Sequence, residues 1–313
     1  MNHSLRDLVA FLCMAVLTVA LGTALPAQAQ TASPSEPAAW DRVRVLDLNS
    51  MPWTSPPRRP PGWKFKNIHT IETTAGGAEL VFIPPGWSTN SPRHYDKENG
   101  WYYFVEGESA VIYYKNPQDQ VGTVYHNRPG TLFYGVEGAI HYFDVRTVVP
   151  EGCILLSWHD KRPTIQPVPF DSKETTLNGQ PWPYPRIINT PEEPWEKSPD
   201  GYLSKRLYDN GGPSLEMRYY SPGWRSSGAK EYADYDRWIY VMNGSLNLKV
   251  YEGPKDANGK AMRAWKGQVV EAPANAIFGG ADTIEATEIG AWVLVWREQS
   301  GTIREISSPT GQP

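Results

Sequence analysis

The chain carries one sequence pattern twice. Pro85-Gly86-Trp87 recurs 137 residues later as Pro222-Gly223-Trp224. Five further pairs keep this offset: Glu79 with Glu216, Trp101 with Trp238, Tyr103 with Tyr240, Gly107 with Gly244, and Gly130 with Gly267. With small shifts the match extends outward, to residues 43–46 with 186–188, Trp53 with Trp195, and 155–158 with 293–296. Each copy is long enough to bury a core of its own, so the 313 residues predict two copies of one fold.

Each copy contains the pattern of a β-hairpin. Runs rich in aromatic and β-branched residues flank a turn that contains glycine: 101–105 and 110–114 around Gly107, and 238–242 and 246–251 around Gly244. Such runs around such turns favour antiparallel strands. Because no segment keeps a helical period, the sequence predicts an all-β fold with little helix.

The first forty residues are expected to lie outside this fold. Arg6 precedes the apolar run Leu8–Leu25, and the small-residue site Ala27-Gln28-Ala29 follows, so residues 1–29 are interpreted as a secretory signal peptide. An uncleaved membrane anchor is the alternative, since the run is nearly long enough to span a bilayer. Residues 30–40, rich in Pro, Ser and Ala, are expected to be a flexible leader. The prediction is a periplasmic or secreted protein with no membrane contact after cleavage.

Composition and motifs exclude several classes of function. The net charge is −4 and no basic run occurs, which argues against a nucleic-acid partner. The chain has no nucleophile elbow, Walker loop, dinucleotide-binding glycine motif, C-x-x-C or H-E-x-x-H. After signal cleavage Cys153 is the single cysteine, and its apolar surroundings predict a buried structural thiol.

The first hairpin, with Tyr-Phe-Val-Glu-Gly-Glu at residues 103–108, resembles the centre of the cupin fold. That resemblance implies a small jelly-roll barrel in each copy, and hence a bicupin. The expected first barrel is 41–160 and the expected second barrel is 186–305. A Pro-rich connector, 161–185, is expected between them.

Cupins carry two motifs, G-x5-H-x-H-x3–4-E-x6-G and G-x5-P-x-G-x2-H-x3-N, whose three His and one Glu converge on a divalent metal. Aligning the first motif on Gly107 places His94 and Asp96 at the two His positions and Gly100 at the Glu position. The second motif fits from Gly130 to His141, with Val145 in place of the Asn. The resemblance thus implies His94, Asp96 and His141 as metal ligands. The same positions in the second copy are Glu231, Ala233, Arg237 and Phe278, so that barrel has lost the metal motif.

Two His and one carboxylate suit Fe, Mn, Ni, Cu or Zn, and with open positions they suit activation of O2 or of a chelating substrate. The missing Glu equally favours a barrel without a cofactor, where His94 and Asp96 lie on a solvated rim and His141 bonds within a polar cavity. Spacing alone does not decide whether Glu98 replaces the lost Glu. His126 and His159 are interpreted as ordinary residues at strand edges.

Two functions remain open at this stage. The first is a metal-dependent enzyme of oxygenase, isomerase or lyase type, acting on a small polar molecule in the first barrel. The alternative is a binding protein for a sugar or aromatic ligand without metal or catalysis. Tyr102 and Phe104 are the candidate substrate contacts. Trp87, Trp101, Trp224 and Trp238 recur in both copies and are interpreted as architectural. The second barrel is expected to serve as scaffold or as the surface of a homodimer.

Overall fold

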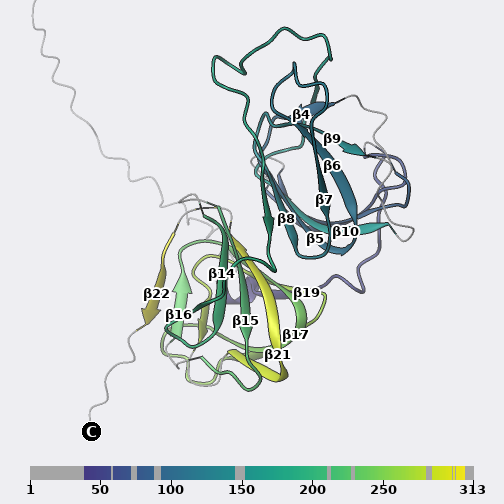
Figure 1. Cartoon of the computed structure of the whole chain (residues 1–313). Helices are drawn as coiled ribbons and strands as arrows, with labels where there is room; N and C mark the ends of the chain where they lie inside the picture. The colour runs from purple at the N-terminus through teal and green to yellow at the C-terminus, as the bar shows by residue number, and fades with distance from the viewer. Residues whose placement is uncertain are drawn as a thin grey trace, which may run out of the picture. The chain divides into compact units, whose positions relative to one another are not determined.

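The structure is a computed structural model that describes residues 39–306, except 58, 72–75, 88–92, 145–151, 210–212, 227–229, 280–283, 298 and 300 (Figure 1). Its described residues form strands and one short 3-10 helix, η1 (Ala39–Arg42), which confirms the all-β prediction. None of its helices is long and apolar enough to cross a membrane. The predicted signal peptide, most of the leader and Val145 lie outside the described residues.

The first copy builds two sheets. Its strands are β1 (Arg44–Asp47), β2 (Lys64–Thr70), β3 (Gly77–Ile83), β4 (His94–Asp96), β5 (Gly100–Gly107), β6 (Ser109–Tyr114), β7 (Thr123–Asn127), β8 (Thr131–Gly135), β9 (Ile140–Asp144), β10 (Cys153–His159) and β11 (Ile165–Pro167). One sheet has the order β12-β8-β5-β10-β3-β2 and the other has the order β11-β4-β9-β6-β7. β11 lies within the expected connector and pairs with β4, the strand that carries His94 and Asp96.

The second copy repeats this succession with longer strands, most of which join β1 in one 11-stranded sheet. Its strands are β12 (Arg186–Asn189), β13 (Glu196–Lys197), β14 (Leu203–Asp209), β15 (Ser214–Tyr220), β16 (Lys230–Ala233), β17 (Arg237–Tyr251), β18 (Lys260–Trp265), β19 (Gln268–Ala272), β20 (Ile277–Gly279), β21 (Ile284–Arg297) and β22 (Ile303–Ile306). β17 corresponds to β5 and β6 joined into one strand, and its pairing with β21 shifts register at 241/243 and 244/246. These bulges let one strand bend through both layers of the barrel.

The two barrels exchange a strand. β1, from the first copy, pairs with β19 of the second barrel, and β12, from the second copy, pairs with β8 of the first barrel. A buried lysine fixes the chain just beyond each exchanged strand: Lys66 Nζ donates to the Leu48 carbonyl, and Lys205 Nζ donates to the Thr190 carbonyl at 2.7 Å. Each ammonium also lies 4.4 Å from the ring centre of a repeated tryptophan, Trp53 or Trp195. The sequence boundary between the copies is therefore not the boundary between the barrels.

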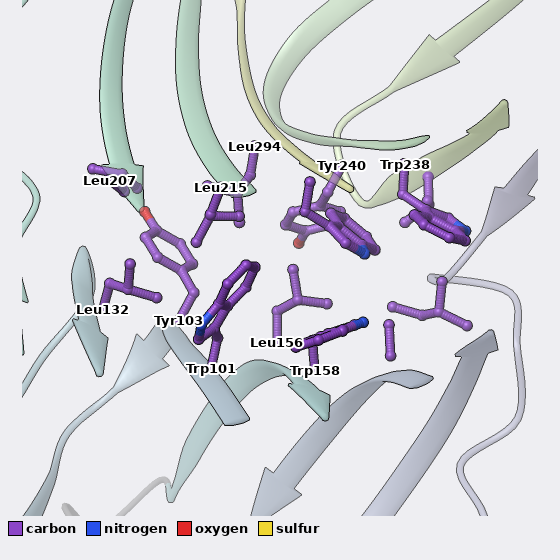
Figure 2. Close-up of a cluster of buried hydrophobic side chains, with 14 of the residues drawn as sticks. Trp101, Tyr103, Leu132, Leu156, Trp158, Leu207, Leu215, Trp238, Tyr240 and Leu294 are labelled. Atoms are coloured by element: carbon purple, nitrogen blue, oxygen red, sulfur yellow. The ribbon is translucent and has the colours of Figure 1, made fainter. Parts of the chain in front are cut away.

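A shared hydrophobic core joins the two barrels (Figure 2). It is built from residues at matched positions in both copies, among them Trp101, Tyr103, Leu156, Trp158, Trp238, Tyr240, Leu294 and Trp296. Trp238 is 1% exposed and stacks on Trp296 with ring centres 5.8 Å apart. Trp101 and Trp238 are thus architectural, as their recurrence indicated.

The opposite faces of the same sheets line the barrel interiors. In the first barrel these interior residues include Phe65, Val81, Phe104, Cys153 and Leu155. Cys153 is 1% exposed and burial raises its thiol pKa to about 12, which agrees with a structural role. In the second barrel a larger apolar cluster around Val241, Leu248 and Val293 fills the interior.

Candidate metal centre

The structure brings His94, Asp96 and His141 together inside the first barrel. His94 and Asp96 alternate along β4, so their side chains lie on one face of the strand. β9 pairs with β4 and places His141 directly opposite His94, with the two ring centres 4.6 Å apart. Each of the three residues offers one ligand atom, and these atoms lie within 4.8 Å of one another. Among the described residues no other group of His, Cys, Asp and Glu meets this condition.

The backbone fixes which nitrogen of His141 faces the site. His141 Nδ1 lies 3.0 Å from the Ala139 carbonyl, which can only accept, so Nδ1 carries the proton. Nε2 of the neutral ring then presents a lone pair, and it lies 3.5 Å from Asp96 Oδ2. Two acceptors this close are stabilised by a proton or a cation between them. This arrangement fits a metal ligand held by a carbonyl through its other nitrogen.

Burial sets the protonation of these groups. It raises the Asp96 pKa to about 6, although the nearby His94 opposes the change. Burial also lowers the His141 pKa, against the hydrogen bond to Ala139. Both groups are therefore poorly solvated, and a cation would replace the solvation that their charged and lone-pair forms lack.

The donor set fits a divalent transition metal. The three candidate ligand atoms lie within 4.8 Å of one another, so small side-chain rotations would bring all three within the roughly 2.1 Å at which such ligands bind one ion. Two imidazoles and one carboxylate leave other coordination positions open, as in mononuclear oxygen-activating and Lewis-acid centres.

The fourth position of the cupin motif is filled in another way. Gly100 pairs with His159 across β5 and β10. A Cβ on Gly100 would lie 3.0 Å from the Tyr102 hydroxyl and 3.1 Å from His159 Nδ1. The Tyr102 hydroxyl and the His159 ring therefore occupy the space in which the side chain of the family's Glu would lie.

A cavity of about 140 Å³ opens beside the three candidate ligands. Apolar groups form much of its wall, including Trp63 and Trp87, whose rings pack edge to face at 4.7 Å. Trp87 therefore lines the site, which its recurrence did not indicate. Tyr102 lines the cavity too, whereas Phe104 is not among the lining residues and packs in the interior core. At the cavity edge, one nitrogen of Arg59 lies 2.7 Å from both carboxylate oxygens of Glu79.

The structure gives two buried polar groups, Glu98 and His159, a place in this cavity that the sequence did not decide for Glu98 and did not predict for His159. Glu98 is 2% exposed, and its Oε2 accepts from the Thr164 amide just before β11. Its Oε1 lies 3.9 Å from Nδ1 of His159, which is 8% exposed and lines the same cavity. Neither of these two atoms has a hydrogen-bond partner among the described residues.

The pKa values of Glu98 and His159 favour two neutral groups. Burial, with Asp96 adding to it, raises the Glu98 pKa to about 8. Burial lowers the His159 pKa to about 3, and the Arg59 charge adds to this. The interpretation of His159 as an edge residue was wrong. The alternation of Leu155, Ser157 and His159 along β10, all on the cavity side, is the sequence signal that could have found it. His126 is exposed on β7, as expected.

The second barrel shows what replaced the metal motif there. Glu231 pairs with Phe278 across β16 and β20, the same register as His94 with His141. Arg237, at the position of the family's Glu, donates to Glu231 at 3.2 Å and lies 5.0 Å over the Phe278 ring. Asn275 keeps the turn before β20 with φ of 65°, where the first barrel has Gly138 at 89°. The turn survives, and an ion pair occupies the ligand positions.

No protein-family model matches the chain, and a search of curated proteins finds no relative. Solved structures do match. A protein from Nostoc punctiforme proposed to be a dioxygenase aligns with a TM-score of 0.60 and 12% identity, over 85% of this chain and 87% of its own. Salicylate 1,2-dioxygenase from Pseudoaminobacter salicylatoxidans aligns at 0.56 and 12%, over 88% of each chain.

The coconut allergen cocosin aligns equally well, at 0.56 and 12% identity, over 87% of this chain and 90% of its own. These neighbours share the fold of the chain across most of its length. At this identity they show the fold alone, which in this chain is two tandem barrels of the cupin jelly-roll type.

Proposed function

We propose that the chain is a metal-dependent enzyme of the oxygenase, isomerase or lyase type, with its site in the first barrel and a small polar molecule as substrate. The observation that carries this proposal is the convergence of His94, Asp96 and His141 in one buried cluster beside a cavity. The predicted signal peptide adds export to the periplasm or beyond as part of the same proposal.

His94, Asp96 and His141 would hold the metal, which would supply Lewis-acid or oxygen-activating chemistry there. The rest of the cavity belongs to the chain's own residues. Trp63 and Trp87 exclude water from one side, which strengthens every polar interaction inside.

Glu98 and His159 provide the polar recognition. In the protein without metal, burial raises the Glu98 pKa to about 8, which favours the neutral carboxyl that can donate a hydrogen bond. His159, neutral at that pH, offers one donor and one acceptor. Because both groups are buried and keep an atom without a partner among the described residues, a substrate with a hydroxyl or carbonyl oxygen would complete their hydrogen bonds. The cavity volume favours a small substrate over an oligosaccharide.

A binding protein without metal is the second candidate, and the cavity wall favours it in one respect. Tyr102, Phe133, Trp63 and Trp87 give that wall an aromatic surface suited to a flat or sugar-like ligand. The neighbours include both a dioxygenase and a seed allergen, so the fold does not choose between catalysis and its absence.

Metal content decides between the two candidates. The protein is purified from its export compartment without a His-rich tag, and its metals are measured by elemental mass spectrometry. We expect about one transition metal per chain, lost in His141→Ala and kept in His126→Ala, the exposed histidine of the same barrel. Protein that stays free of metal after incubation with Fe, Mn, Ni, Cu and Zn would exclude the enzyme as proposed.

A further inference from the structure

The second barrel contains a cavity of its own, of about 220 Å³, which overlaps in position with the Glu79, Glu98 and His159 side of the first cavity. The counterparts of the three candidate ligands do not line it. Glu216 and Val295 line it as cross-strand partners, just as Glu79 and Ser157 do in the first barrel. Three other positions of the lining give the second cavity a different charge.

Arginines occupy these three positions. Arg237 pairs with Arg297 in the second barrel where Gly100 pairs with His159 in the first. Arg218 follows Glu216 by two residues on β15, as Val81 follows Glu79 on β3. All three arginines line the cavity. The Arg237 guanidinium therefore lies where the motif would place a metal ligand. In the second cavity arginines supply positive charge where a metal would supply it in the first.

The arginines are only partly neutralised by nearby carboxylates. Arg218 lies 2.8 Å from Glu216, Arg237 3.2 Å from Glu231, and Arg297 3.9 Å from Asp209. A fourth arginine, Arg206, lies at the rim of the cavity, and its guanidinium is 3.8 Å from the same Asp209 carboxylate. Each of the three cavity arginines has one carboxylate, and the largely exposed Arg206 adds a fourth guanidinium. Among the described residues this leaves one positive charge in excess at the mouth of the cavity.

Donors remain unused as well. The Nε atoms of Arg218 and Arg297 are buried and have no acceptor among the described residues. A guanidinium has five N–H donors, and Arg237 makes one hydrogen bond to a side chain, through Nη1. Buried donors without acceptors are rare in folded proteins, so these point to an acceptor beyond the described residues, which a bound ligand would supply.

We propose that this arginine cavity binds a small organic carboxylate. One excess positive charge matches a monoanion better than a phosphate dianion, and planar guanidiniums match a carboxylate in two-pronged hydrogen bonds. Tyr235 and Val295 give the cavity an apolar wall for the body of the acid. The volume, below the roughly 300–1,000 Å³ of drug-sized sites, restricts the ligand to a small molecule. This site is independent of any metal in the first barrel.

Calorimetric titration with benzoate tests the proposal. The full chain is treated with EDTA and carries His141→Ala, so that metal coordination in the first barrel does not contribute. Benzyl alcohol serves as the neutral match, and inorganic phosphate serves as the competing oxyanion. We expect one benzoate per chain, with benzyl alcohol and phosphate at least tenfold weaker.

The variants locate the binding. Arg237→Met and Arg297→Met should each weaken benzoate at least tenfold, while Arg263→Met, an exposed arginine of the same barrel, should stay within twofold. If thermal melts show that the methionine variants are not folded, Arg297→Lys replaces them. This variant keeps the positive charge but loses the planar guanidinium that makes two parallel hydrogen bonds, so it should bind benzoate several-fold more weakly than the unaltered protein. Absence of benzoate binding, equal binding by the arginine variants, or tighter binding of phosphate would each overturn the proposal.

Discussion

The two barrels differ on one face of their sheets and agree on the other. Trp101 and Trp238, Tyr103 and Tyr240, Trp158 and Trp296 face the shared core and are identical. The residues that alternate with them face the barrel interiors and have changed: Gly100 to Arg237, Tyr102 to Ile239, Ser157 to Val295, His159 to Arg297. Because neighbours along a strand point to opposite faces, one strand carries both a fixed face and a variable face. On these strands the repeated residues face the shared core, whereas the three candidate ligands, Glu98 and His159 are residues that did not repeat. Glu79 and Trp87, which also line the cavity, are the repeated exceptions.

The largest expected effect comes from breaking the shared face. Trp238→Ala removes a side chain that is 1% exposed and stacked on Trp296, so we expect a loss of about 3–5 kcal/mol in the free energy of unfolding. Trp265→Ala, at a tryptophan that is 48% exposed in the same barrel, should cost less than about 1 kcal/mol. Urea unfolding measures both. Equal losses would mean that the shared face is not what stabilises the barrels.

The second prediction compares equivalent positions on the variable face. His94→Ala should weaken metal binding at least about 100-fold, because it removes one of three ligands. Glu231→Ala, at the same place in the second barrel, should leave metal affinity unchanged. Competition with a fluorescent chelator measures both affinities. A comparable loss in the two variants would place the metal outside the His94 cluster.

The third prediction concerns pH. Burial lowers the His159 pKa to about 3, whereas the unfolded chain binds this proton near pH 6.5. The neutral native ring therefore contributes stability above pH 6.5 that is lost as pH falls toward 3. Between pH 7 and 4.5, His159→Gln should lose about 1–2 kcal/mol less stability than the unaltered protein, both measured by urea unfolding without metal. Parallel losses would indicate that the His159 ring is protonated in the folded state.

The smallest effect is expected at Gly100. A methyl group there would crowd the Tyr102 hydroxyl and His159, so Gly100→Ala should cost about 1 kcal/mol, and His159→Ala should remove the part of that cost that its ring causes. Gly253→Ala is the control, since a Cβ at Gly253 meets nothing within 4 Å. Thermal melts of the single and double variants measure the coupling. Full cost in the double variant would show that His159 is not what crowds this position.

Sequence reasoning predicted the fold because a hairpin is a local pattern and the repeat shows the same hairpin pattern twice. It also named His94, Asp96 and His141, because the motif counts positions from a turn glycine that both copies keep. It left open whether Glu98 replaces the missing Glu and wrongly placed His159 at a strand edge, since neither residue lies at a motif position. What makes them part of the cavity is burial by β11 and β10, which is a property of the tertiary fold. Sequence patterns did not reveal the arginine cavity either, because Arg218, Arg237 and Arg297 come together only when their strands pair.

The strand exchange ties the folding of each half to the other. Val45 in β1 pairs with Val270, which lies 225 residues farther along the chain. The pairing of β1 therefore cannot form until that later segment is in place. Contacts of such long range fold slowly and leave strand edges open meanwhile. If the chain were cut within residues 170–180, each fragment would hold the strand that completes the other barrel. The two fragments would be complementary parts of one molecule, and neither would be a cupin barrel by itself.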